Sequence, residues 1–369
     1  MKNYPVVVYG ASGYTGRLAC EFLRSFGIPF VAAGRSRERL EAAMRLVPGI
    51  ENAAYAIAEV EHDVEALRKL FEGSRVVCNV VGPFLLHGRP VVEAALRANC
   101  HYLDTTGEQP FMLEMREAFA TDYRRADLLL APSTAYMHAV LEIACRRCEQ
   151  HGELDTLEAL CVPTGTPTFA FTQTIFQTAR TKEYYLEGGQ LTPWPAAYGA
   201  DVRVPYTDRT LLGLPWSGMA LPVWFEHHPR IRNVRGLTAF TSRELMTQVH
   251  SIYKHYHDNL AALPESEQRA ELAKIAAGIQ PGSPPRENPL VHRNWDTVVG
   301  SGSHGRVRYT VYSHCPYQQT GLLQAFAASC LLKQPPQVSG FASPSQAFGS
   351  ENLLGVLERF GYAKLVREA

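Results

Sequence analysis

Three glycines at a spacing of three residues follow an apolar run near the start of the chain. The run is Val6–Tyr9, and the residues after it are Gly10, Ala11, Ser12, Gly13, Tyr14, Thr15 and Gly16. Apolar residues at helical spacing come next, so the pattern predicts a strand, a tight turn and a helix. Such a turn lets backbone N–H groups approach a pyrophosphate at the helix N-terminus. We therefore assign all seven turn residues to a dinucleotide site; the alternative is a turn that serves packing only.

The end of the second predicted strand indicates which dinucleotide is bound. The strand covers residues 28–33 and is followed by Gly34, Arg35, Ser36 and Arg37. NAD-binding folds place an acidic residue here, on the ribose 2′-hydroxyl. Arginine suits a 2′-phosphate instead, because its guanidinium grips phosphate oxygens and an acid would repel them. These four residues predict NADP(H) rather than NAD(H), unless the arginines are only solvated residues at the start of a helix.

Two later strand ends complete the predicted cofactor site. A continuous apolar run over residues 75–81 reads as a strand buried on both faces. It ends in Val81, Gly82, Pro83 and Phe84, and a further short strand, His101–Asp104, is followed by Thr106 and Gly107. We assign these six residues after the strands to the path of the cofactor. The next helix is predicted over residues 90–98, with Pro90 in its first turn.

The regular alternation of strands and helices predicts the fold class. Six strands separated by helices up to residue 131 indicate an α/β Rossmann domain with a doubly wound parallel sheet. We place this domain at residues 1–132, and a second α+β domain with a mixed sheet at 133–318. Within the second domain, residues 169–185 are expected to be helical and residues 220–225 extended. Residues 350–360 are expected to form a final helix beside the first sheet.

Four motifs in order resemble the saccharopine dehydrogenase-like reductases, a family that includes bacterial trans-acting enoyl reductases. They are residues 10–16, 33–37, 81–84 and 101–108. The resemblance is dense over the first 132 residues, is faint in the middle, and returns at 319–323 and 344–349. It implies an NADP-dependent reductase whose C-terminal helices, about 319–369, rejoin the nucleotide domain. It also implies a second domain that holds substrate and pairs two subunits, so a homodimer is expected.

The chain departs from this family where substrate would meet the nicotinamide. A segment of the type Gly-Phe-Asp-Ser-x-Pro is replaced by residues 132–138, which read Pro-Ser-Thr-Ala-Tyr-Met-His. Reduction of a double bond needs a proton as well as a hydride, and histidine titrates near neutrality. Tyr136 and His138 are therefore the candidate catalytic residues. The alternative is that they only open the next helix.

Composition excludes some function classes. Lys plus Arg and Asp plus Glu both total 36, so no strong field favours nucleic acid. The eight scattered cysteines indicate reduced thiols, and the first residues leave no room for a signal peptide, so a cytoplasmic protein is expected. Cys145 and Cys148 form a CxxC pair without a second pair, which favours helix packing over zinc. No metal site is expected.

Two further patterns remain open to more than one interpretation. The apolar stretch 211–225 is too short and too interrupted to span a bilayer. It fits the rim of a substrate cleft, while peripheral membrane contact is less favoured. His250, His255 and His257 do not have the spacing of metal ligands on one helix face, so they are expected at the surface.

Three functions fit these residues. The favoured one is an NADPH-dependent reductase of an activated C=C bond in a bulky apolar substrate. It is favoured because residues 211–225, with Phe169, Phe171 and Phe176, are apolar and aromatic, and in part because the resemblance to trans-acting enoyl reductases implies it. A saccharopine-type C=N reductase would need cations for substrate carboxylates. The residues that could supply them are Arg203, Arg209, Arg230, Arg232 and Arg235. A sensor or scaffold that binds NADP(H) without turnover has the same nucleotide motifs.

Overall fold

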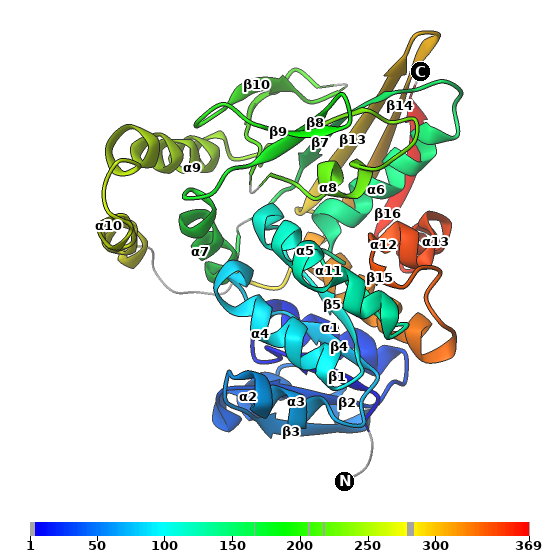
Figure 1. Ribbon diagram of the computed structural model, residues 1–369. Helices are drawn as coiled ribbons and strands as arrows, with labels where there is room; N and C mark the ends of the chain where they lie inside the picture. The colour runs from blue at the N-terminus through cyan, green and yellow to red at the C-terminus, as the bar shows by residue number, and fades with distance from the viewer. Residues whose placement is uncertain (1–3, 166, 206, 217, 279–283, 369) are drawn as a thin grey trace. The chain divides into compact units, whose positions relative to one another are not determined.

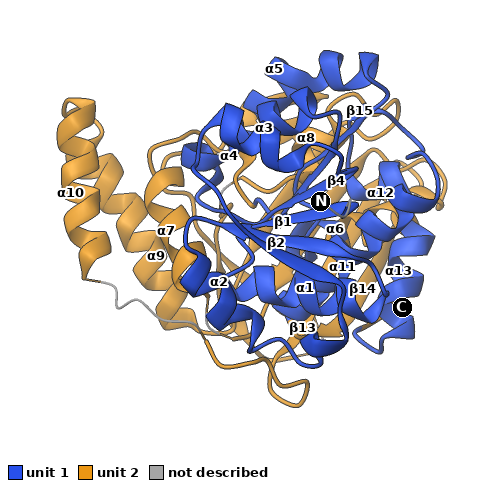
Figure 2. Ribbon diagram, turned by 90° about the horizontal axis from the view of Figure 1, so that it is seen from below, with its two compact units in different colours: residues 1–106, 111–139, 316–362 blue, residues 107–110, 140–315, 363–369 orange. Residues whose placement is uncertain are grey.

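The computed structural model describes residues 4–165, 167–205, 207–216, 218–278 and 284–368. The chain forms two compact units, each built from separate stretches of sequence (Figure 2). The first unit contains residues 1–106, 111–139 and 316–362; the second contains 107–110, 140–315 and 363–369. The first boundary predicted from the sequence, at residue 132, lies seven residues before the end of this stretch of the first unit.

A parallel sheet lies at the centre of the first unit (Figure 1). Its strands within the described residues are β1 (Val6–Tyr9), β2 (Phe30–Gly34), β3 (Tyr55–Glu59), β4 (Val76–Asn79), β5 (His101–Asp104), β6 (Leu129–Ala131) and β15 (Gly340–Phe341). The spatial order is β15-β6-β5-β4-β1-β2-β3, and every neighbouring pair is parallel. The chain order reverses between β1 and β4, which is where a doubly wound sheet binds ligands.

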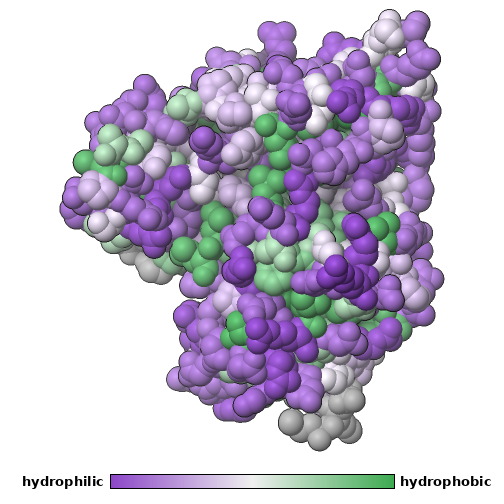
Figure 3. All heavy atoms as spheres, viewed as in Figure 1, coloured by the Kyte–Doolittle hydropathy of each residue, from purple (hydrophilic) through white to green (hydrophobic). Residues whose placement is uncertain are grey.

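Helices cover both faces of this sheet. They are α1 (Tyr14–Ser25), α2 (Arg37–Met44), α3 (Val64–Phe71), α4 (Phe84–Arg97), α5 (Gln109–Arg125), α11 (Pro316–Lys333), α12 (Pro344–Phe348) and α13 (Ser350–Arg359), with a 3-10 turn at Ile50–Asn52. Apolar residues of α3, α4 and α5 form one buried cluster with Val7 and Tyr9. Alternate residues of the same strands face α1 and α11 on the other side. The outer face of α2 and α3 is hydrophilic (Figure 3).

The C-terminal part of the chain completes the first unit. Helix α11 packs along α1, and Gly321 marks the closest approach of the two helices. A Cβ at Gly321 would lie 2.8 Å from the backbone carbonyl carbon of Leu18. The α11 carbonyls of Leu331 and Leu332 accept hydrogen bonds from Arg75, each at 2.9 Å. The return of residues 316–362 to the first unit is therefore close-packed, as predicted. Residues 363–368, predicted to belong to this unit as well, instead form strand β16 in the second unit, because they pair with β14.

The second unit contains a mixed sheet. Its strands within the described residues are β7 (Thr156–Val162), β8 (Tyr184–Glu187), β9 (Gln190–Pro193), β12 (Asn233–Thr238), β13 (Arg293–Gly302), β14 (Gly305–His314) and β16 (Ala363–Glu368). The order is β16-β14-β13-β7-β12-β8-β9, in which only β7 and β12 are parallel. The two sheets together confirm the predicted fold class.

Helices and a hairpin surround the second sheet. They are α6 (Tyr136–Glu149), which crosses the unit boundary, α7 (Phe169–Thr178), α8 (Leu221–Phe225), α9 (Arg243–His255), a π-helical turn (Tyr256–Leu260), α10 (Glu265–Ala277), and the pair β10 (Ala200–Arg203) and β11 (Thr210–Gly213). No described helix is long and apolar enough to cross a bilayer.

Three local predictions are wrong. The helix predicted over 169–185 ends at Thr178, whose hydroxyl bonds the carbonyl of Thr174, and residues 184–187 form strand β8. Residues 221–225, predicted to be extended, form α8, because Pro222 suits a first helical turn, which needs no N–H there. Pro90 lies inside α4, since that helix already begins at Phe84.

The contact at Gly321 yields a stability prediction. Gly321→Ala should lower the free energy of unfolding by about 1–3 kcal/mol, because the added methyl group meets the α1 backbone. The matched control is Gly355→Ala in α13, where an added Cβ meets no atom within 4 Å. The control should stabilise by about 0.5–1 kcal/mol through helix propensity. Urea unfolding of both variants measures the two effects, and equal effects would contradict the close packing.

Candidate cofactor site and the residues around it

The glycine turn is tied to the sheet and leads into an α1 N-terminus that has no side-chain cap. Gly10 has φ +96°, and its N–H donates to the carbonyl of Ala33 at 2.9 Å. The N–H of Ala11 donates to the same oxygen at 3.2 Å, so the turn is tied to the end of β2. Gly13 precedes α1 without a side-chain cap. The first N–H groups of α1 are thus not used by a capping side chain.

Two glycines of the turn leave no space for a side chain. A Cβ at Gly16 would lie 2.3 Å from the carbonyl oxygen of Gly10, and one at Gly10 would lie 2.8 Å from a methyl group of Val81. The turn is therefore packed against α1 and against the segment that follows β4. Val81, Gly82 and Pro83 belong to that segment and Phe84 begins α4; these four residues are the ones predicted to border the cofactor. The cradle fits a dinucleotide, since a side chain at either glycine would close it.

The residues after β2 divide into two roles. The Ser36 hydroxyl accepts from the N–H of Arg39 at 3.3 Å and caps α2. Arg37 forms an exposed ion pair of 3.8 Å with Glu41. Arg35 is exposed and makes no hydrogen bond or ion pair within the described part of the chain. Among the predicted 2′-phosphate residues, Arg35 is thus the one whose guanidinium has neither a hydrogen-bond nor an ion-pair partner among the described residues.

A buried polar network lies at the carboxyl ends of β4 and β5. Its central residue is Asp104, which was not among the predicted site residues. Oδ1 of Asp104 accepts from the N–H of Thr106 at 2.9 Å and from the N–H of Ser133 at 2.7 Å. The other carboxylate oxygen accepts from the hydroxyl of Tyr102 at 3.0 Å, and Asn79 donates to that hydroxyl at 2.9 Å. The polar residues that end two buried strands were the available signal. Gly107, predicted beside Thr106, falls in the second unit.

The candidate proton donors lie in the first turn of α6. Tyr136 and His138 are both buried, with exposed fractions of 3% and 1%. The Nδ1 atom of His138 is 2.8 Å from the Ser133 hydroxyl, and Ser133 has φ +60°. The Tyr136 N–H donates to the hydroxyl of Thr320 at 3.1 Å. The structure thus links His138 to Asp104 through Ser133, while the catalytic role of both candidates stays a prediction.

Burial changes the chemistry open to His138. Desolvation lowers the pKa of its imidazole to about 3. At neutral pH the ring is uncharged, so it can pass a proton along a hydrogen bond but is not a ready imidazolium acid. The hydroxyl of Ser133 is the neighbour through which such a transfer would run.

The cysteines and histidines of the described residues do not gather into a group of three or more potential metal ligands. Cys145 and Cys148 are buried free thiols in α6, and burial raises both pKa values, that of Cys148 to about 12. No group of three or more potential metal-ligating side chains occurs among the described residues. His255 and His257 are exposed, whereas His250 is half-buried and lies 2.8 Å from the carbonyl oxygen of Ala197.

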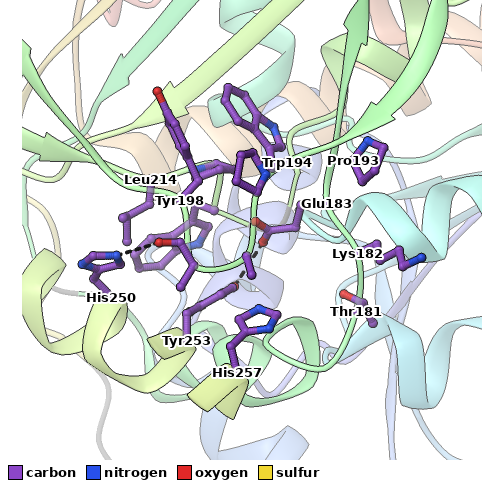
Figure 4. A pocket seen from close by; sticks show the side chains of 15 residues that line it. Thr181, Lys182, Glu183, Pro193, Trp194, Tyr198, Leu214, His250, Tyr253 and His257 are labelled. Carbon is purple, nitrogen blue, oxygen red and sulfur yellow. Dashed lines mark hydrogen bonds between the residues drawn. The ribbon is translucent and has the colours of Figure 1, made fainter. Parts of the chain in front are cut away.

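A cavity of about 190 Å³ lies within the second unit (Figure 4). Aromatic rings form much of its lining, including Trp194, Tyr198, Trp216 and Tyr253. A polar side is formed by Glu183, whose carboxylate accepts from the Tyr253 hydroxyl at 3.2 Å. Of the apolar stretch 211–225, residues 214–216 line the cavity, and every described residue of the stretch is buried or half-buried.

Two family models match the chain, one in its N-terminal part and one in the remainder. A family model described as the saccharopine dehydrogenase NADP binding domain matches residues 6–126. A second model, described as a family of unknown function (DUF5938), matches residues 139–367, more than half of the chain. The first match confirms the expected NADP cofactor and the resemblance on which part of that expectation rested.

Individual curated relatives match only part of the chain. A lipid droplet localized protein of Caenorhabditis elegans is 29% identical over 190 residues, which are 48% of this chain and 44% of the relative. A trans-acting enoyl reductase of Mycobacterium tuberculosis is 34% identical over 113 residues, 30% of this chain and 27% of the relative. The matches thus span less than half the length of these curated relatives. Saccharopine dehydrogenase (L-Glu forming) of Saccharomyces cerevisiae shares the fold, with TM-score 0.60, 13% identity and 99% of both chains covered.

The buried imidazole of His138 yields a pH prediction. Its pKa in the folded protein lies below the value of 6.5 expected on unfolding, so its contribution to stability is complete above pH 6.5 and is lost as pH falls. The unfolding free energy of the wild type relative to His138→Gln should fall by about 2 kcal/mol between pH 7.5 and pH 5. Denaturant titrations at the two pH values measure this change. The exposed His227→Gln variant is the control, and a pH-independent difference for His138→Gln would disprove the neutral buried state.

Proposed function

We propose that this chain, which belongs to the DUF5938 family and carries a saccharopine dehydrogenase NADP-binding domain, is an NADPH-dependent reductase of an activated C=C bond. The observation that carries the proposal is the combination of the glycine cradle at Gly10–Gly16 with Arg35 at the end of β2. The hydrogen bonds of Gly10 and Ala11 to Ala33 tie these two features together, two residues before Arg35.

The residues of the cradle have separate tasks in cofactor binding. The turn and the first N–H groups of α1 would hold the pyrophosphate, and Arg35 would hold the 2′-phosphate. Val81–Phe84 and Thr106 would border the rest of the cofactor. NADPH, when bound, supplies a hydride. The remaining task of the chain is to bind the acceptor, exclude water from it and deliver a proton.

An apolar acceptor is supported by the second unit. The aromatic lining of its cavity suits a hydrocarbon chain or ring better than a charged substrate. Three of the five arginines that could bind substrate carboxylates are already engaged: Arg230 donates to the carbonyls of Glu149 and Gly152, Arg232 to that of Gly188, and Arg235 pairs with Glu187 at 2.8 Å. These contacts make a C=N reductase of a dicarboxylate the less favoured alternative.

The proposed source of the proton is the buried polar residues in the first turn of α6. Tyr136 and His138 are the candidate donors, and His138 would act as a neutral relay to the Ser133 hydroxyl rather than as a cationic acid. Asp104 would position Ser133 by accepting its N–H. We further propose a homodimer, as the family resemblance implies, and a cytoplasmic location, which the scattered cysteines favour. The name of the C. elegans relative makes a lipid surface the alternative location to test.

Cofactor choice tests the role of Arg35. Arg35→Asp should weaken NADPH binding about 10- to 100-fold, because a charge-assisted contact worth about 1.5–3 kcal/mol is lost, and should leave NADH binding nearly unchanged. Arg45→Asp, at the other end of α2, makes the same charge change and should alter neither affinity. Titrations followed by nicotinamide fluorescence give both constants. Equal losses for NADPH and NADH in Arg35→Asp would refute the assignment.

Turnover tests the reaction and the proton donor. NADPH oxidation is followed with a medium-chain 2-enoyl thioester and, separately, with an imine; the enoyl substrate should be the faster. Tyr136→Phe or His138→Gln should lower kcat about 100-fold or more with cofactor affinity intact, since general acid catalysis contributes about that much. Tyr55→Phe, on the remote edge strand β3, should change neither. Tight NADPH binding without oxidation by any acceptor would favour the sensor, and unchanged kcat in both variants would exclude these donors.

A further inference from the structure

A cluster of aromatic and imidazole rings lies at the carboxyl end of the first sheet. The hydroxyl of Tyr9, the last residue of β1, is 2.8 Å from Nδ1 of His62, which lies between β3 and α3. Their rings are stacked, with centroids 5.9 Å apart and planes within 5°. His87 of α4 stands edge-on to His62 at 5.3 Å. Neither histidine was singled out by the sequence.

The register of the strands brings Arg35 to the same place. Ala33 pairs with Tyr9 on one side of β2, and Gly34 pairs with Glu59 of β3 on the other. The chain then leaves the sheet at Arg35, between the strand ends that carry Tyr9 and lead to His62. The positive charge of Arg35 is close enough to lower the pKa values of Tyr9, His62 and His87. The charge of Arg35 therefore affects the protonation of Tyr9, His62 and His87 alike.

The pKa values of both imidazoles are lowered in this arrangement, which favours the neutral form of each ring. Burial is the main cause that lowers the pKa of each, and Arg35 adds to it; for His62, His87 contributes as well. The nearby acids are Glu61, which is exposed, and Asp63, which raises the pKa of His62 slightly while its carboxylate caps α3. Burial raises the pKa of Tyr9 to about 12, so this side chain remains a phenol.

The hydrogen bond between Tyr9 and His62 is compatible with either charge state of the ring. In the neutral tautomer with the hydrogen on Nε2, the phenol donates to Nδ1; this Nε2 is buried and has no hydrogen-bond partner within the described residues. With charged His62, Nδ1 donates and the phenol oxygen accepts. A proton can therefore be added without loss of this contact. An unsatisfied buried donor is destabilising until a ligand or water reaches it.

We propose that His62 and His87 form with Arg35 a proton-linked site for the 2′-phosphate, so that binding of NADP(H) places a proton on this pair and the preference over NAD(H) grows as pH falls from 8 to 6.5. The inference rests on the proposed cofactor function. A 2′-phosphate brings nearly two negative charges and compensates Arg35, which is one of the causes that keep the rings neutral. NAD(H) lacks this phosphate and should bind without the proton.

Calorimetry with the full-length protein tests the linkage. NADP+ and NAD+ are titrated at pH 8, 7.25 and 6.5, each in two buffers of different ionisation enthalpy. The affinity for NADP+ should increase about tenfold over this range with uptake of up to one proton, while NAD+ binding stays flat. His62→Gln and His87→Gln retain a polar side chain. At least one should abolish the uptake and flatten the NADP+ profile, with NAD+ affinity unchanged; the exposed His227→Gln should behave as wild type.

The outcomes separate the two proposals. Selective NADP+ binding with no proton uptake at any pH would overturn the histidine linkage and leave the cofactor assignment intact. Lack of binding of either nucleotide would overturn both. As a measurement independent of variants, the imidazole resonances of His62 and His87 are titrated by NMR with and without NADP+. A higher pKa for one of them in the complex is expected, and identical titration curves would contradict the proposal.

Discussion

The approach of two backbone segments at Gly10 and Gly16 constrains the whole first unit. The carbonyl oxygen of Gly10 occupies the space where a side chain at position 16 would begin, so the first turn of α1 rests directly on the strand end. The N–H groups of Gly10 and Ala11 share the carbonyl of Ala33, which fixes the end of β2 against the same turn. One set of close backbone contacts thus sets the distance from the helix N-terminus to Arg35.

A second constraint is the buried carboxylate of Asp104. It accepts N–H groups from its own loop and from the loop after β6, so it ties together the loops that leave two neighbouring strands of the sheet. Ser133 takes a left-handed backbone conformation there, and its hydroxyl contacts His138. Such strain persists where the surroundings specify it, and it is common at functional positions. These hydrogen bonds hold Ser133 and His138 in place within residues 132–138, the segment that departs from the family motif.

The sequence was sufficient where the signals are local. The glycine turn, the buried parallel strands and the loss of the acid after β2 each depend on residues close in the chain, and the parallel sheet and the NADP-binding domain follow from them. Pairings between distant segments could not be predicted. Three such pairings depend on tertiary packing: His62 stacks on Tyr9, α11 packs against α1 at Gly321, and β16 pairs with β14. Short apolar runs were also ambiguous, as in α8, where period alone does not separate strand from helix.

The path of the chain has a consequence for biosynthesis. The backbone passes from one unit to the other after residues 106, 110, 139, 315 and 362, and α11 covers α1 only once residues 316–333 have been made. During translation, one helix layer of the nascent nucleotide-binding sheet therefore stays incomplete until residues 140–315 of the second unit have been synthesised. Helix α11 is synthesised only after residues 140–315 of the second unit. Because each unit consists of separate stretches of sequence, neither can be exchanged, duplicated or expressed as one continuous segment of the gene.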